Sequence, residues 1–147
     1  MAFDSLTSYV AAIAVKSTAD PAANAEFTFT VPTGKLWEPI SLSVQLVQGA
    51  TQTPWPYLVI DDGTNTLCQQ PGGSAALGVS STAQYTWART GLGGTASLGA
   101  TPNINVISAL PEIVLPAGFR IRSNTIGKGA NTDYGIPRLI VVEYDAR

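Results

Sequence analysis

The chain of 147 residues contains no histidine, one cysteine and one methionine. Without histidine it lacks the commonest general base and the commonest metal ligand, and a serine–histidine–aspartate triad cannot be built. A single cysteine excludes an intrachain disulfide and a zinc site made of thiolates. These absences argue against ordinary enzyme chemistry, and we predict a non-enzymatic protein with no metal site and no cofactor.

Charge is also scarce, because only 12% of the residues are charged and 8 Lys and Arg stand against 10 Asp and Glu. So few basic residues make a phosphate-binding face unexpected, and we predict no nucleic-acid partner. The hydrophobic share of 45% excludes intrinsic disorder. Neutral polar residues, above all 16 Thr and 11 Ser, must therefore cover the surface. Such a surface packs against another protein with a small desolvation cost.

The apolar stretch nearest the start of the chain, Val10–Val15, is only six residues long, and no basic residue precedes it. We therefore expect neither a signal peptide nor a membrane span. This pattern predicts synthesis in the cytoplasm and no membrane partner.

The N-terminal segment permits two conformations. Leu6, Tyr9, Val10 and Ile13 follow the i, i+3, i+4, i+7 spacing of a short helix, yet the same residues could run as an extended arm. Pro21 ends either element, because proline disfavours helix in the residue before it. The segment either folds back on its own domain or reaches a neighbouring subunit.

From residue 26 onward the apolar residues recur with the period of two that is typical of β-strands. Asp61–Asn65 contains an Asp-Gly pair between apolar runs and predicts a hairpin turn. In the longest run, Leu36, Ile40, Leu42, Val44 and Leu46 are expected to share a face. The candidate strands are 26–31, 36–48, 55–60, 66–68, 81–87, 104–108, 112–115, 119–124 and 134–144.

About eight strands with turns between them predict an all-β fold. We expect an antiparallel two-sheet sandwich with jelly-roll topology, with an immunoglobulin-like sandwich or a small barrel as the alternatives. The predicted organisation is an arm or short helix over 1–25 and a β-sandwich domain over 26–147.

Two segments share the form apolar-Pro-x-Gly followed by a strand, namely Val31–Gly34 and Leu115–Gly118. Proline at the second position and glycine at the fourth suit a type I turn. Each segment is therefore predicted to form a tight corner between strands.

Two long segments rich in glycine and small residues, 69–80 and 89–103, interrupt the strand pattern. Ordered loops of this length often carry function, although these two could also be plain connections. Their apolar residues are candidates for contact with another protein, and they are Leu77, Val79, Leu92 and Leu98.

Three motifs with possible chemistry have simpler explanations. Asp61 and Asp62 lack the ligand spacing of a calcium loop and fit turn chemistry. Gly91–Gly94 lacks the ending and the strand–loop–helix context of a phosphate loop. Nothing in the sequence places Glu112 beside Glu143 as an acid–base pair.

Two further groups of side chains are candidates for binding. Arg120 and Arg122 lie two apart in a predicted strand and share a face, where they either dock on an acidic partner or are simply solvated. The aromatic residues either pack in the core or form a sugar platform or an interface hot spot, and they are Trp37, Trp55, Tyr57, Tyr85 and Trp87.

Four stretches, residues 27–37, 58–65, 115–122 and 137–144, carry a resemblance to a known family. They are Phe-Thr-Phe-Thr-Val-Pro-Thr-Gly-Lys-Leu-Trp, Leu-Val-Ile-Asp-Asp-Gly-Thr-Asn, Leu-Pro-Ala-Gly-Phe-Arg-Ile-Arg and Pro-Arg-Leu-Ile-Val-Val-Glu-Tyr. Together they resemble small virion proteins of tailed bacteriophages, and among these the capsid decoration (cement) proteins. The matching motifs mark corners and strands, not a catalytic site.

This resemblance implies a β-sandwich protein on the capsid surface of the virion, made in the host cytoplasm. Its implied partners are the major capsid protein and further copies of itself in a homotrimer. The implied alternative is a tail, baseplate or receptor-binding, lectin-like module, and only this alternative includes carbohydrate as a partner. The residues that we predict at the partner interface are Leu6, Tyr9, Ile13, Leu77, Val79, Leu92, Leu98, Arg120 and Arg122.

Overall fold

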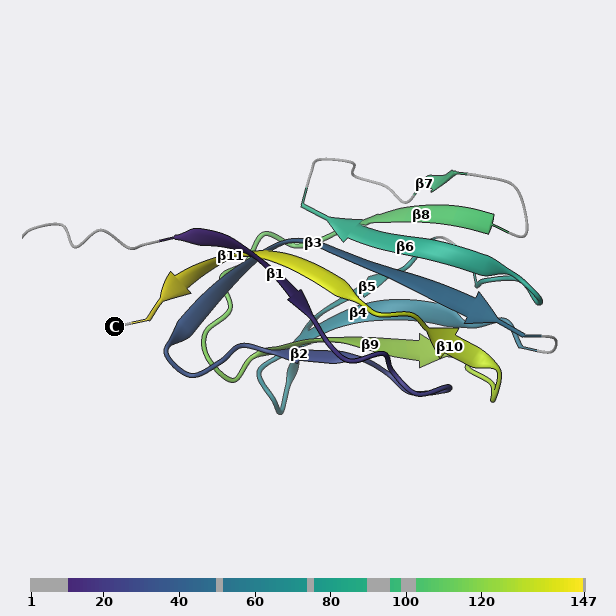
Figure 1. Cartoon of the computed structure of the whole chain (residues 1–147), viewed down its shortest axis with the longest axis horizontal. Helices are drawn as coiled ribbons and strands as arrows, with labels where there is room; N and C mark the ends of the chain where they lie inside the picture. The colour runs from purple at the N-terminus through teal and green to yellow at the C-terminus, as the bar shows by residue number, and fades with distance from the viewer. Residues whose placement is uncertain (1–10, 50–51, 74–75, 90–95, 99–102, 147) are drawn as a thin grey trace, which may run out of the picture.

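The computed structural model describes residues 11–49, 52–73, 76–89, 96–98 and 103–146, and within these ranges the chain forms strands and no helix (Figure 1). The all-β prediction is confirmed. The strands are β1 (Ala12–Ser17), β2 (Thr28–Thr30), β3 (Lys35–Gln48), β4 (Trp55–Asp61), β5 (Thr66–Pro71), β6 (Thr82–Ala88), β7 (Ala96–Leu98), β8 (Asn103–Ala109), β9 (Arg120–Ile126), β10 (Thr132–Tyr134) and β11 (Arg138–Asp145).

The strands form two sheets that pack as a sandwich (Figure 1). Sheet A has the order β1-β11-β3-β6-β8-β7, and sheet B has the order β2-β9-β4-β5. In sheet A, β10 pairs with the C-terminal end of β3, after the residues of β3 that pair with β11. Every pair is antiparallel except β6 with β8, which run parallel. The two-layer prediction is therefore confirmed, whereas the jelly-roll topology is not confirmed.

The core lies between the two sheets and follows the period of two along each strand. Leu42, Val44 and Leu46 of β3 and Leu58 and Ile60 of β4 are each at most 1% exposed. Burial of large aliphatic side chains contributes about 1.5–3 kcal/mol each, so this layer holds the sandwich together.

A β-bulge changes the inward face of β3 near its start. The pairing of β11 with β3 shifts register between Ile140 and Val141, which leaves Ile40 without a partner there. Trp37 therefore faces the core and is 4% exposed, whereas Leu36 and Ile40 are only partly buried. The expectation that Leu36 and Ile40 share the inward face with Leu42 is wrong for this reason.

The two Pro-x-Gly corners lie side by side. The backbone N–H of Gly118 donates to the carbonyl of Val31 at 2.9 Å, and the N–H of Val31 donates to the carbonyl of Phe119 at 2.9 Å. The two corners therefore support each other, although they are far apart in the sequence.

Each corner forms its turn one residue later than expected. The N–H of Lys35 donates to Pro32 at 3.1 Å, and the N–H of Phe119 donates to Pro116 at 3.2 Å. Proline is thus the first residue of each turn and glycine the third. A positive φ at the third position is the requirement of a type II turn, and it explains the glycine.

The described part of the N-terminal segment is extended. β1 pairs with β11 in an unbroken antiparallel register from Ala12 opposite Glu143 to Ser17 opposite Arg138. Residues 12–17 are therefore extended and not helical, and they fold back on their own domain as the edge strand of sheet A. Leu6, Tyr9 and Val10, which the helix alternative needs, lie outside the described residues.

Two other strand predictions need correction. Residues 112–115 form no strand, and only Leu115 makes a single bridge, to Trp37. The predicted strand 134–144 is interrupted between β10 and β11. Pro137 lies directly before β11, as expected for a residue that cannot donate to the sheet.

Candidate partner interface

β1 presents an apolar stripe on the outer face of sheet A. Ile13 is 75% exposed and Val15 is 63% exposed, the two highest values among the exposed large hydrophobic residues of the described ranges. Their partners across the strand pair are Val142 and Ile140 of β11, both partly buried. Four β-branched side chains therefore lie together at one edge of the sandwich.

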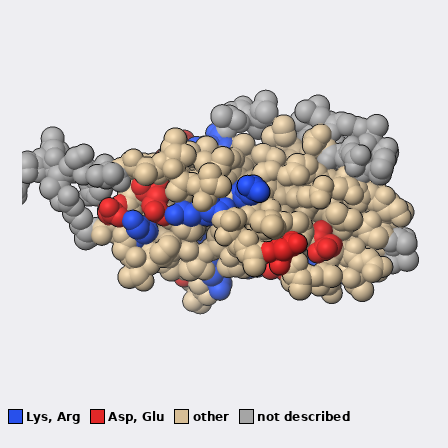
Figure 2. Space-filling view, in the orientation of Figure 1, with Lys and Arg blue, Asp and Glu red and all other residues tan. Residues whose placement is uncertain are grey.

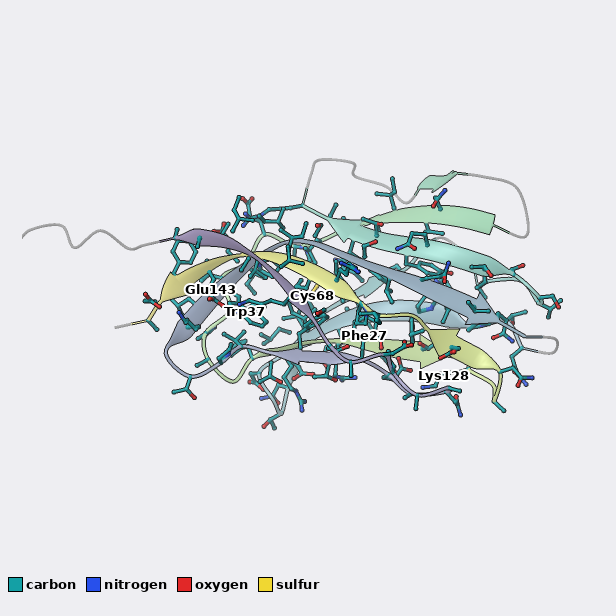
Figure 3. The ribbon with its side chains drawn as sticks, viewed as in Figure 1. Phe27, Trp37, Cys68, Lys128 and Glu143 are labelled. Carbon is teal, nitrogen blue, oxygen red and sulfur yellow. The ribbon has the colours of Figure 1, made fainter. Side chains whose placement is uncertain are left out.

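The inward side of β1 carries a charged residue. Lys16 places Nζ 2.6 Å from an Oε of Glu143 and 5.3 Å from the ring centroid of Trp37. Trp37 Nε1 donates to Glu143 Oε2 at 2.7 Å, and Figure 3 shows these two side chains together. A cation over an indole ring is attracted by the ring quadrupole, so three side chains hold this end of β1.

The surroundings of Glu143 favour its ionised form. The hydrogen bond from Lys16 lowers the pKa of Glu143, burial raises it, and the hydrogen bond from Trp37 lowers it again, so the pKa is below its ordinary value. Lys35 adds a second cation at 3.7 Å. Glu143 therefore stays charged at neutral pH and keeps Lys16 in place.

A groove of about 500 Å³ opens between β1 of sheet A and β2 of sheet B. Lys16, Phe29 and Trp37 contribute to its lining. Phe29 and Trp37 are also core residues, at 4% exposure each. The groove therefore reaches the hydrophobic core at the side of the sandwich formed by β1 and β2.

Arg120 and Arg122 form a cluster around one carboxylate. Arg120 Nε donates to Asp61 Oδ1 at 2.6 Å, and Arg122 Nε donates to Asp61 Oδ2 at 2.7 Å. Burial raises the pKa of Asp61, but the hydrogen bonds from Arg120, Arg122 and the N–H of Gly63 outweigh it, and the pKa falls to about 2. Both arginines share a face of β9, as predicted, and both are tied to the sandwich.

Three of the five candidate aromatic residues belong to the core. Trp37, Tyr85 and Trp87 are between 1% and 4% exposed. Trp55 and Tyr57 are partly buried on β4, and their ring centroids lie 5.4 Å apart. An aromatic platform is therefore available only at Trp55 and Tyr57.

The remaining interface candidates lie in different environments. Leu77 is 3% exposed and belongs to the core, so its side chain is no surface contact in this structure, whereas Val79 is 49% exposed. Leu98 lies in β7, and its side chain is outside the described part of the structure. Leu6, Tyr9 and Leu92 also lie outside the described residues.

Glu112 and Glu143 each pair with a different cation and not with each other. Glu112 Oε1 lies 3.6 Å from Arg89 Nε, whereas Glu143 pairs with Lys16. The Asp62 carboxylate accepts hydrogen bonds from the N–H groups of Thr64 and Asn65, as expected of turn chemistry.

The described part of the chain contains no group of three or more His, Cys, Asp or Glu side chains that could hold a metal ion. No helix there is both long and apolar enough to span a membrane.

Sequence reasoning selected Ile13 but missed Lys16, Trp37 and Glu143 as a cluster. The alternation of two β-branched residues, Ile13 and Val15, with Ala14 and Lys16 was a readable strand signal. The contact with Glu143 was not readable, because only the pairing of β1 with β11 brings the two ends of the chain together.

No protein-family model and no curated protein sequence matches this chain.

Proposed function

We propose that this chain is a non-enzymatic structural protein of a tailed-phage virion, a decoration (cement) protein that binds the capsid surface and stabilises contacts between capsomers. The sequence resemblance supports this role through motifs that form strands and corners of the sandwich. Its partners in this proposal are the major capsid protein and further copies of itself in a homotrimer. Several weak contacts made at once by one oligomer would give tight attachment to the shell.

The observation that carries the proposal is the exposed apolar stripe on a surface with few charges. In Figure 2 uncharged residues cover most of the visible face, and the charged residues form small groups. Ile13 and Val15 expose most of their apolar side chains to solvent. Burying such side chains against a shell releases water from apolar surface without a large cost for stripping charges.

Co-sedimentation with purified empty capsids and, separately, with purified tails tests this function. We expect saturable binding to capsids alone, in a ratio set by the number of capsomer junctions. Ile13→Asp should weaken that binding at least tenfold, whereas Ile126→Asp, which also alters an exposed isoleucine but on sheet B, should not. Binding to tails alone, or to neither particle, would contradict the decoration role.

The second candidate function is a tail, baseplate or receptor-binding module that recognises carbohydrate. Trp55 and Tyr57 favour it, because adjacent aromatic rings on a sheet face offer a stacking surface. Asn124 pairs with Tyr57 across the strands and is exposed, so it can add hydrogen bonds to a sugar.

Tryptophan fluorescence separates this candidate from the first. Trp37 and Trp87 are buried, so a bound sugar would change mainly the emission of Trp55. Titration with host polysaccharide should then shift the emission of the native protein and leave that of Trp55→Phe unchanged. An emission that does not respond to the polysaccharide would exclude this platform.

A further inference from the structure

β1 has an edge that is suited to accept another strand. One edge pairs with β11 through six residue pairs without a register shift, and the other edge has no strand partner in the described structure. Unpaired N–H and C=O groups along such an edge form a template for strand addition. Both outward-facing side chains in the middle of β1, Ile13 and Val15, are apolar and β-branched, which favours sheet pairing.

The two edges of sheet B differ from β1. β2 has only three residues. β5 ends in Pro71, and its pairing with β4 contains a register shift between Ile60 and Asp61. Short strands, prolines and bulges limit strand addition, and β1 has none of these features.

Lys16 is the only charged residue of β1, and its side chain points inward. An inward-pointing charge on an edge strand usually opposes the addition of a second strand. Here the charge is already paired, because Lys16 Nζ lies 2.6 Å from Glu143. The paired lysine therefore does not prevent a second strand from adding to the edge of β1.

We propose that a second copy of this chain pairs with β1, antiparallel and across a two-fold axis at Ala14. In this register Ile13 faces the partner subunit's Val15, and Ala12 faces the partner subunit's Lys16. Pairing of β-branched residues across strands stabilises a sheet, and each such pair would occur twice. The apolar stripe of sheet A would become continuous across the two subunits.

The charges in this register do not oppose it. Ala12 pairs with Glu143 in β11, so the partner subunit's Lys16, Ala12 and Glu143 would lie in one row across three strands. Each Lys16 keeps the Glu143 of its own chain as its ion partner at 2.6 Å. Strands lie about 4.8 Å apart, so the additional lysine would have a carboxylate, and not another cation, two strands away.

The size of the interface sets the expected affinity. An interface built on one six-residue strand is smaller than that of most stable dimers, so the dissociation constant should be micromolar rather than nanomolar. The pairing is independent of the proposed function, since it requires only copies of this chain. On a shell that displays many copies, it would add avidity.

Cysteine cross-linking tests the register. In a Cys68→Ser background, Ala14→Cys places the two new cysteines opposite each other on the two-fold axis, within the Cα spacing that a disulfide needs. We expect oxidation to give a covalent dimer. Ser17→Cys is the matched control, because its two copies would lie roughly 20 Å apart in this register. No cross-link at residue 14, or equal cross-linking at both positions, would overturn the proposal.

Sedimentation equilibrium tests the association without a cross-link. The native protein should dimerise reversibly from its 15.3 kDa monomer. The double variant Ile13→Lys with Val15→Lys places lysine opposite lysine and should weaken dimerisation at least tenfold, whereas Ile126→Lys should not. A native protein that stays monomeric up to millimolar concentration, or whose association the double variant leaves unchanged, would overturn the two-fold pairing. Neither result depends on a capsid, so failure here is distinguishable from failure of the proposed decoration role in capsid co-sedimentation.

Discussion

Lys16 in β1 and Glu143 near the end of β11 lie 2.6 Å apart beside the ring of Trp37. In the strand register Lys16 faces Leu139 and not Glu143, so the ion pair runs along the inner side of the two strands. It joins the edge strand to a buried tryptophan of β3. β1 is thus held by its backbone hydrogen bonds and by this contact, while Ile13 and Val15 remain exposed.

Lys16→Met should remove the ion pair and keep the apolar stem of the side chain. We expect the free energy of unfolding to fall by about 1 kcal/mol, since the pair is only partly shielded from solvent. The loss should shrink at high salt, which screens the native ion pair. Urea unfolding at low and high salt measures both effects. Arg138→Met is the control, because Arg138 is exposed at the start of β11 and belongs to no ion pair among the described residues. An equal or larger loss in the control would contradict the importance of Lys16.

Asp61 should make the stability depend on pH below about 4. Its pKa is about 2 in the folded protein and 3.8 in the absence of these contacts. The folded value is the lower one, so Asp61 contributes its full stabilisation above the unfolded pKa and loses it as the pH falls toward 2. A shift of this size corresponds to about 2 kcal/mol.

Asp61→Asn tests this dependence. The variant should be less stable than the native protein at pH 7, and the difference should shrink between pH 4 and pH 2, as followed by urea unfolding. Glu38 and Glu143 also have lowered pKa values, so the difference between the two proteins is the quantity to compare. Asp133→Asn, at an exposed position, is the control and should leave the stability unchanged. A pH-independent difference would contradict the role of Asp61.

The sequence predicts those parts of the fold that are stabilised by contacts between residues close together in the chain. The hairpin at Asp61–Asn65 was predictable because Asp62 accepts hydrogen bonds from the backbone of its own turn. The alternation of β3 was predictable from Leu42 onward. The inward position of Trp37 was not, because the bulge that moves it arises from the pairing with β11.

The candidate site was less predictable than the fold. The same spacing at Ile13 fits a helix and an alternating strand, and the available edge of β11 decides between them. Arg120 and Arg122 were correctly placed on one face, but their shared carboxylate comes from a different strand. Contacts between distant strands leave no periodic signal in one sequence.

The glycines of the two corners should be sensitive to substitution for a backbone reason. Gly34 has a φ of +76° and Gly118 a φ of +88°, and a Cβ at either position would have no heavy atom within 4 Å. The cost of Gly34→Ala or Gly118→Ala is therefore the cost of the left-handed backbone alone, about 1–2 kcal/mol. Gly34→Asn should cost less, because asparagine tolerates this conformation better.

Thermal unfolding of these variants measures the cost. Gly78→Ala is the matched control, since a Cβ there would make an ordinary contact of 3.5 Å with Ser81 Oγ and its φ is not positive. It should be neutral or slightly stabilising, because alanine reduces the entropy of the unfolded chain. Equal destabilisation by all three alanines would show that space, and not backbone conformation, sets the cost.

Two N-terminal deletions should have different effects, because β1 lies between their end points. Deletion of residues 1–10 removes none of the described strands, so we expect the free energy of unfolding to stay within about 0.5 kcal/mol of the native value. Deletion of residues 1–17 removes β1 with its hydrogen bonds to β11 and the Lys16–Glu143 pair, and should cost at least about 2 kcal/mol. Urea unfolding measures both free energies of unfolding.

Capsid co-sedimentation of the shorter deletion then separates two contributions to binding. Retained binding would assign it to β1 and the sandwich, whereas lost binding in a fully folded protein would assign it to residues 1–10, where Leu6 and Tyr9 lie.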